Sequence, residues 1–255
     1  MRISCFTLII GINLILELHC SAQFDFQDLD FEQAKPLADP LGPVIPADVF
    51  AASALPGWNV ALGSIPQTDV LQNLYAINQA SVDIFGPNYQ AAAQYPYYVP
   101  GVIDGDYSVL LQEGNLPSGP TLVPASISQF GFIPEAAQSF AFKAYMTPGA
   151  LFSISFNGVN LNPLLIQSGS AYNLYDVDIS SYAGQLGELE FTDLVTPLPS
   201  AIGLDDITFS SAPIVPEPNV GILSVIGGLM VYGPTWLKRR REPWARIFKW
   251  RRRRI

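Results

Sequence analysis

Asp205 raises the first chemical question in this sequence. It opens an alternating segment in which Ile207 and Phe209 are apolar, within a predicted strand at 205–209. If these two residues face the core, alternation turns Asp205 inward as well, where an unpaired carboxylate costs several kcal/mol. Either a cation compensates the charge, or Asp205 lies at the solvated rim and caps a turn. Calcium suits the first alternative, because it takes hard oxygen ligands that this acidic chain can supply.

A second group of candidate residues is aromatic. Tyr95, Tyr97 and Tyr98 are interleaved with prolines in a predicted loop, and Trp58 could join them. Exposed aromatic rings stack on the C–H faces of sugars, so these residues predict a carbohydrate site. The alternative is that the rings pack at the end of the domain, since aromatic side chains fill cores as readily as they bind ligands.

The remaining inventory excludes most catalytic chemistry. Cys5, His19 and Cys20 all lie in the first 22 residues, which resemble a cleaved signal peptide. Without them no disulfide, thiolate site or histidine relay can form. The sequence also contains no phosphate loop, dinucleotide fingerprint or nucleophile elbow. We therefore expect no enzyme, and a glycan-active enzyme with paired carboxylates is the remaining catalytic alternative.

Charge is divided unevenly along the chain. Between residues 23 and 213 there are two lysines, no arginine and 19 acidic residues, a net charge of −17. Such a surface repels nucleic acid and phosphorylated ligands and offers no clamp for an anion. Neutral ligands and cations remain as partners.

Short apolar segments between turn residues predict an all-β fold. They lie at 58–62, 81–85, 107–111, 126–133, 139–145, 151–156, 172–179, 186–191 and 205–209. This spacing is typical of a sandwich or barrel. Asn157 and Gly158 predict a tight hairpin turn into a short strand at 159–161. Upstream, residues 24–26 and 29–32 alternate as a first strand would, and 35–56 is predicted to be an extended loop.

Both ends of the chain carry export signals. Arg2, an apolar region over 6–16 and small residues around position 22 predict a signal peptide cleaved after Ala22. Near the other end, residues 219–237 carry no charge and are just long enough, as a helix, to span a bilayer. A buried core helix is the alternative. The basic cluster at 238–241 marks a cytoplasmic end and places the upstream residues outside the cytoplasm.

The C-terminal pattern resembles a known sorting signal. A Pro-Glu-Pro motif, an apolar span and an arginine cluster follow one another; the motif and cluster are Pro216, Glu217, Pro218, Arg239, Arg240 and Arg241. This order is similar to the PEP-CTERM signal of exported bacterial envelope proteins. The resemblance implies an exosortase-type protease at the inner membrane, which cuts near the motif and releases or re-attaches the ectodomain. The basic, aromatic extension at 242–255 departs from the pattern, because such signals usually stop soon after the arginines.

The predicted sandwich resembles the galactose-binding-like jelly rolls. The matching stretches are 139–142, 152–158, 175–184, 189–191 and 204–207, with 29–34 and 55–58 as the first strand. The resemblance implies a jelly-roll-like fold and a structural calcium held between an acid of the first strand and an acid of the last. Glu32 and Asp205 occupy those positions, with Asp30 and Asp206 nearby.

Together these features predict an exported protein in five parts. They are a signal peptide (1–22), a first strand with an extended loop (23–56), a β-sandwich (57–212), a sorting signal (213–241) and a cytoplasmic extension (242–255). We expect it to be anchored in the inner membrane and then processed to the cell surface or extracellular matrix, with a structural or adhesive role. The alternative is a carbohydrate-binding protein that recognises a neutral extracellular polysaccharide.

Overall fold

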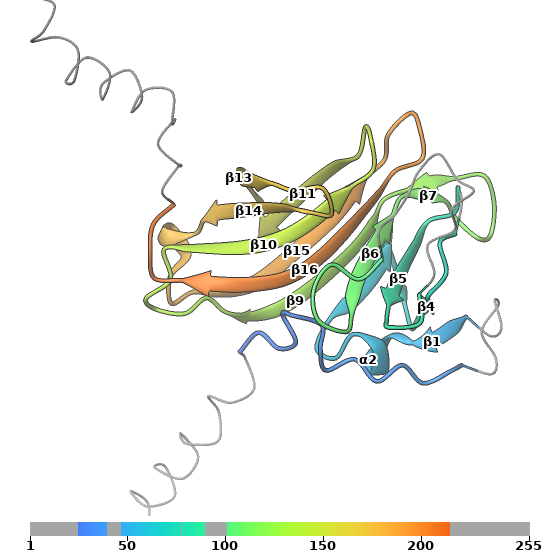
Figure 1. Ribbon diagram of the computed structural model, residues 1–255, viewed down its shortest axis with the longest axis horizontal. Coiled ribbons are helices and arrows are strands. Elements are labelled where there is room, and N and C mark those ends of the chain that lie inside the picture. Colours follow the sequence, from blue (N-terminus) through green and yellow to red (C-terminus); the bar gives the residue numbers. More distant parts are fainter. Residues whose placement is uncertain (1–24, 40–46, 77, 90–100, 215–255) are drawn as a thin grey trace, which may run out of the picture. The chain divides into compact units, whose positions relative to one another are not determined.

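Two β-sheets face each other across an apolar core (Figure 1). The computed structural model describes residues 25–39, 47–76, 78–89 and 101–214. The predicted signal peptide, the tyrosines at 95–98 and the whole C-terminal region from Val215 lie outside the described residues. Within the described ranges, no helix has the length and apolar character needed to cross a membrane.

The larger sheet has eight strands in the order β1-β4-β5-β6-β16-β10-β14-β13. Their bounds are β1 Asp48–Phe50, β4 Asp69–Gln72, β5 Ser81–Phe85, β6 Ser108–Gln112, β10 Ser139–Met146, β13 Pro163–Ser168, β14 Asn173–Asp178 and β16 Ala201–Ser210. All its pairings are antiparallel except that of β4 with β5. Two strands joined in parallel need a connection that returns to the starting end, and residues 73–80 provide it.

The smaller sheet has six strands in the order β12-β11-β15-β9-β2-β3, all antiparallel. Their bounds are β2 Asn59–Leu62, β3 Ile65–Gln67, β9 Ala125–Phe132, β11 Leu151–Phe156, β12 Val159–Leu161 and β15 Leu186–Leu194. The remaining elements are a ribbon of β7 (Gly114–Asn115) and β8 (Leu122–Val123), the short helix α2 (Ala51–Ala54) and the 3₁₀ turn η1 (Ser180–Tyr182).

Phenylalanine side chains from both sheets fill the space between them. Phe140 and Phe142 of β10 contact Phe191 of β15, with ring centroids 6.2 and 5.7 Å apart. All three side chains are fully buried. In β15, Leu189 points inward with Phe191 while Glu188 is exposed, as the two-residue period of a strand requires. This shared apolar core holds the two sheets together.

At β5 and β6 the larger sheet is buried on both faces. Val82 and Ile84 belong to the main core, whereas Phe85 packs with Leu110 and Ala201 in a second cluster. The two sets alternate along the strands, so the second cluster lies on the outer face of the sheet. One part of the larger sheet is therefore covered by chain on the side that a simple sandwich leaves to solvent.

The all-β class and the sandwich are confirmed. Each of the nine segments predicted to be strands from residue 57 onward contains a strand, with ends shifted by a few residues. The predicted hairpin turn is confirmed too, because Asn157 and Gly158 have φ angles of 50° and 73° and lead into β12. Both values lie in the left-handed region that a tight hairpin needs.

Two predictions upstream of residue 57 are wrong. Residues 29–33 form turns instead of a first strand, and Asp28 and Phe31 have φ angles of 48° and 58° that an extended chain cannot adopt. The segment 35–56 is more than an extended loop, since it contains α2 and β1, and β1 pairs with β4 in the larger sheet. The sandwich thus begins before residue 57.

Candidate functional site

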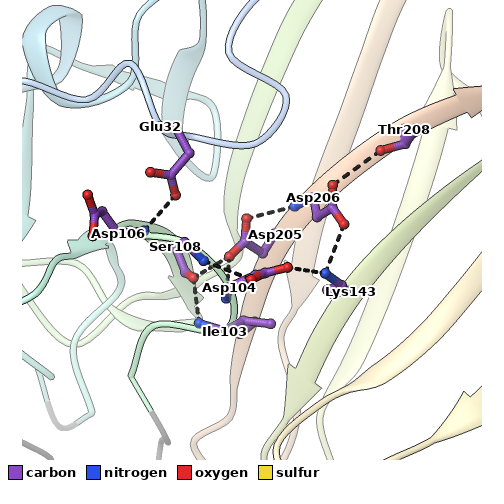
Figure 2. A network of polar contacts seen from close by, with 10 residues as sticks. Glu32, Ile103, Asp104, Asp106, Ser108, Lys143, Asp205, Asp206 and Thr208 are labelled. Carbon is purple, nitrogen blue, oxygen red and sulfur yellow. Dashed lines mark hydrogen bonds and ion pairs between the residues drawn. The ribbon is translucent and has the colours of Figure 1, made fainter.

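The residues predicted to hold calcium meet in one polar network, which we call the acidic junction (Figure 2). It consists of Glu32, Asp104, Asp106, Ser108, Lys143, Asp205 and Asp206. They come from the turns at 29–33, from the segment that leads into β6, from β10 and from β16. Asp30 lies beside the network and accepts a long hydrogen bond from the Glu32 N–H (3.4 Å). The junction therefore joins parts of the chain that are far apart in sequence.

Asp205 lies at the centre of the acidic junction and is 1% exposed. Its Oδ2 accepts hydrogen bonds from the Ser108 hydroxyl (2.6 Å) and the Asp104 N–H (3.0 Å), and its Oδ1 accepts one from the Asp206 N–H (2.7 Å). Ser108 in turn accepts the Ile103 N–H at 2.7 Å. The buried carboxylate thus holds the start of β6 and the segment before it to β16 through Ser108 and Asp104.

A bulge in β16 decides which way Asp205 points. The register between β10 and β16 shifts by one residue next to the pair Lys143–Asp205, and Asp206 takes up the extra residue with a φ of 50°. Ile207 faces the main core, as predicted, but Asp205 lies on the outer face, on the side of Ala201. The prediction that alternation points both residues into the core is therefore wrong. Asp205 is buried because the segment before β6 covers it.

Burial sets the electrostatics of Asp205. It raises the pKa of this carboxyl to about 7, although the bonds from Ser108 and from the Asp104 and Asp206 N–H groups lower it; the charge of Glu32 raises it further. At neutral pH this group is near its titration midpoint. Asp205 is thus one acid of the junction whose charge depends on pH in the physiological range.

Glu32 fastens the turns at 29–33 to the segment before β6. Its Oε1 accepts the N–H groups of Asp106 (2.8 Å) and Tyr107 (3.1 Å). Gly105 makes this approach possible, since a Cβ there would lie 2.1 Å from the same oxygen, and its φ of 60° also favours glycine. The oxygen-rich turn at 104–106 is therefore built to receive a carboxylate.

Lys143 supplies the positive charge of the junction. It forms ion pairs with Asp104 and with Asp206 (2.9 Å), and its Nζ lies 5.5 Å from the centre of the Tyr172 ring. Burial lowers the pKa of its amine, but the hydrogen bonds to Asp104 and Asp206 outweigh burial and leave that pKa raised. Lys143 accordingly stays charged and bridges the segment before β6 to the bulge in β16.

Trp58 does not present its ring to a ligand. It is 5% exposed, and its ring lies 5.7 Å from that of Phe31 and 6.3 Å from that of Phe191. Its indole N–H donates to the Asp28 carbonyl at 3.1 Å. Trp58 is among the residues that line a pocket of about 540 Å³ beside Phe50, but at 5% exposed its ring has too little open surface to stack on a sugar. The prediction of Trp58 as a sugar platform is wrong, because the turns at 29–33 cover it.

The calcium site stays a prediction. Within the described ranges, no group of three or more acidic side chains is placed to hold a metal ion. Both oxygens of Asp205 already have N–H or O–H donors, and Asp104 and Asp206 face Lys143. Calcium takes six to eight oxygens, so its binding here would require some of these donors to move. The structure does bring the predicted pair together, because Glu32 and Asp205 both accept hydrogen bonds from the segment before β6.

The sequence analysis missed a pair of acids that are both buried. Glu113 and Asp193 are 1% and 0% exposed. Asp193 accepts the Glu113 N–H (2.9 Å) and the Ser200 hydroxyl (3.2 Å), and Glu113 accepts the Ser200 N–H (3.1 Å). Burial raises the pKa of Asp193 to about 7. Alternation could have found this residue, because Asp193 is two positions beyond inward-facing Phe191 in β15.

Comparisons with known proteins add little to this picture. No known protein family and no curated protein matches the chain. Among solved structures, the enzymatically active domain of tailspike protein 4 from bacteriophage CBA120 is similar with 15% identity and a TM-score of 0.32, over 61% of this chain and 19% of that one. A GH31 alpha-xylosidase from Xanthomonas citri is similar with 14% identity and a TM-score of 0.21, over 66% and 16%.

The chain thus spans less than a fifth of each of these two proteins. Both neighbours are rich in β-structure, as this chain is. At this level of similarity they carry no argument about function. The fold and its junction define an all-β sandwich braced by buried carboxylates, and its function has to be argued from this chain's own residues.

Proposed function

We propose that this protein is an exported structural or adhesive protein of the cell surface or extracellular matrix, sorted by an exosortase through its Pro-Glu-Pro signal. The observation that carries the proposal is how the acidic junction uses its acids. Glu32, Asp104, Asp205 and Asp206 are each bonded to main-chain N–H groups, to a serine hydroxyl or to Lys143. Acids engaged in this way brace the fold and are poorly placed to act on a substrate.

The position of β16 supports a tethered role. This strand leads toward the predicted anchor, and it is a central strand that pairs with β6 on one side and β10 on the other. The Ile207 N–H also bonds to the Leu29 carbonyl at 2.9 Å. A pull on the C-terminal stalk would therefore load a central strand of the larger sheet and the junction beside it.

Mass spectrometry of the mature protein from cell fractions tests this proposal. We expect an N-terminus after Ala22, a C-terminus near the Pro-Glu-Pro motif and a product in the surface or matrix fraction. Changing Pro216, Glu217 and Pro218 to alanine should leave the full-length chain at the inner membrane. The matched control changes Pro134 and Glu135, an exposed Pro-Glu pair in the sandwich, to alanine. Full-length protein found soluble in the cytoplasm, with both ends intact, would contradict the proposal.

The carbohydrate-binding alternative rests on the tyrosines at 95–98. Binding to a glycan panel that is lost on Tyr97→Ala, with the thermal unfolding midpoint unchanged, would favour it over a purely structural role. Trp58→Ala is unsuitable for this purpose, because removing a buried tryptophan costs about 3–5 kcal/mol. Unfolding would then be mistaken for loss of a sugar contact.

The enzymatic alternative has a defined place to look. A cavity of about 190 Å³ beside β1, β4 and β5 is lined by Asp48 and Asp69, and no residue of the acidic junction lines it. Hydrolysis of a polysaccharide that is abolished by Asp48→Asn or Asp69→Asn would argue for a glycan-active enzyme. Hydrolysis that survives both changes would have to come from a contaminant or from residues outside this cavity.

A further inference from the structure

One stretch of the sandwich contains no charged residue. The sequence from Ala144 to Tyr175 contains no acidic or basic residue, although the region 23–213 carries a net charge of −17. This stretch includes β12 and β13, which are edge strands of the smaller and the larger sheet. We call these two strands, with the Asn162 that joins them, the uncharged edge. Asp176, opposite Leu164 on the neighbouring strand, is the first charged residue beyond this stretch.

The core is incompletely closed at the uncharged edge. Val159 of β12 is paired with Phe156, which is fully buried in the core, so Val159 also points inward, yet it is 53% exposed. Leu165 of β13 is paired with Tyr175, whose ring stacks on buried Phe142, yet Leu165 is 48% exposed. Paired residues share a face of their sheet. Two core-facing apolar side chains are therefore left half open to solvent between the edge strands.

The other edges of the sheets are better protected. β3 has Pro66 in its middle, which removes one main-chain donor, and β1 is only three residues long and is bridged by Ala38. β13 has six residues; Pro163 is the first of them, and the pairing with β14 shifts register between Leu165 and Gln167. Edge strands in soluble proteins are usually blunted by charges, prolines or short length. The uncharged edge has no charged residue, and its β13 is the longest of the four edge strands.

We propose that the uncharged edge pairs with the same edge of a second copy of this chain. The charge distribution selects this partner, because two molecules that each carry a large negative charge can approach closely only where neither is charged. The open hydrogen-bonding groups of a strand are complementary to those of an identical antiparallel strand. A two-fold contact would also bring Val159 and Leu165 of both copies together and close both cores. This inference rests on the proposed structural role and names its partner.

Cysteine cross-linking on intact cells tests the pairing with the full-length protein. Leu165→Cys should give a disulfide-linked dimer on a non-reducing gel after mild oxidation. Ile65→Cys is the matched control, because Ile65 also lies on an edge strand and is 47% exposed. We expect the dimer fraction of the first variant to exceed that of the second by about tenfold or more. The parent protein shows whether Cys5 or Cys20 contributes a background band.

A charge swap distinguishes self-pairing from any other partner. Leu165→Glu and Leu165→Lys, each expressed alone, should lower dimer formation about tenfold or more, and co-expression of the two, with different tags, should restore a mixed dimer. Ile65→Glu and Ile65→Lys should have no such effect. An unchanged thermal midpoint for each variant shows that the half-exposed site tolerates the change.

Three results overturn the inference. The first is equal cross-linking at Leu165 and Ile65, and the second is no rescue of the dimer by the opposite charges. The third is that the Leu165 charge variants lose binding to a polysaccharide although the parent protein forms no dimer. Fractionation of the same cells separates the two proposals. A surface-located protein that never cross-links leaves the proposed function standing and removes the pairing, whereas cytoplasmic protein removes both.

Discussion

The acidic junction and the uncharged edge solve opposite problems within one sandwich. At the junction, one buried carboxylate and the more exposed acids around it bond to main-chain N–H groups, to a serine hydroxyl or to Lys143, so distant parts of the chain are tied together. At the edge, charge is absent and main-chain groups stay open, so the chain remains incomplete. Burying charge costs free energy that only specific partners offset, whereas an uncharged edge costs nothing until a partner arrives. The comparison suggests that the junction holds the fold and the edge assembles it.

The largest effect we expect is a loss of stability as the pH rises. Burial raises the pKa of Asp28 to about 6 and the pKa values of Asp193 and Asp205 to about 7. Below about pH 4 these acids are protonated in both the folded and the unfolded state. Between pH 4 and 7 these acids lose their protons in the unfolded state but keep them in the folded state, so the free energy of unfolding falls. A carboxyl whose pKa is raised by about three pH units accounts for up to about 4 kcal/mol of this fall. Urea unfolding should give a free energy several kcal/mol lower at pH 8 than at pH 4.5.

Variants assign this pH dependence to the buried acids. Asp193→Asn and Asp205→Asn should each flatten the profile, because the amide does not titrate. Leu165→Gln, a change at the uncharged edge, should leave its slope unaltered. A profile that is flat between pH 4.5 and 8 in the parent protein would show that these carboxyls are not desolvated as the structure has them.

Calcium would change the balance at the junction. If an ion binds between Glu32 and Asp205, it should stabilise the folded state by about 2.7 kcal/mol at a hundredfold excess over its Kd. The thermal midpoint should then rise with calcium and fall with a chelator, and both responses should vanish in Glu32→Gln and Asp205→Asn. Glu188→Gln, an exposed acid of the smaller sheet, is the control. A midpoint that no chelator moves would remove the calcium prediction.

The strands were predictable because their signals are local. The alternation in β15 and the Asn157-Gly158 turn depend on residues next to one another, and both are confirmed. Asp205 shows where local reasoning ends. The sequence left its burial and a position at the solvated rim as alternatives. Asp205 is buried, but a one-residue bulge at Asp206, with a φ of 50°, turns it to the outer face of the sheet. Register shifts are decided by both strands at once.

The same limit applies to Trp58 and to β13. Trp58 follows a loop and could equally have been exposed; it is buried because the distant turns at 29–33 fold over it, which only the tertiary structure can show. β13 was missed because its sequence begins with an apolar run, Pro163-Leu164-Leu165, and has no two-residue period. A strand at an open edge has no second partner to impose that period. Of the two strands in the edge that we propose to be functional, β12 was therefore predicted and β13 is the one that the pattern hides.

Ser108→Ala probes the junction without removing an acid. It deprives Asp205 of its shortest hydrogen bond, and a buried charged group that loses a donor costs about 2 kcal/mol. The loss should be smaller at pH 5, where Asp205 is mostly protonated. Ser153→Ala, in β11 of the uncharged stretch, is the matched control and should stay within about 0.5 kcal/mol of the parent. Equal losses for both serines would mean that the junction contributes no more than an ordinary strand position.

The smallest effect we expect is that of Lys143→Met. Its partners Asp104 and Asp206 have side chains 59% and 43% exposed, so solvent screens the ion pairs and their loss should cost about 1 kcal/mol or less. The cost should shrink further at high salt, because salt screens exposed charges. Lys35→Met is the control, since Lys35 is the other lysine between residues 23 and 213 and is exposed. If both variants lose the same stability with the same salt dependence, Lys143 acts only through net charge, and the bridge from the segment before β6 to the bulge in β16 is not what holds the junction.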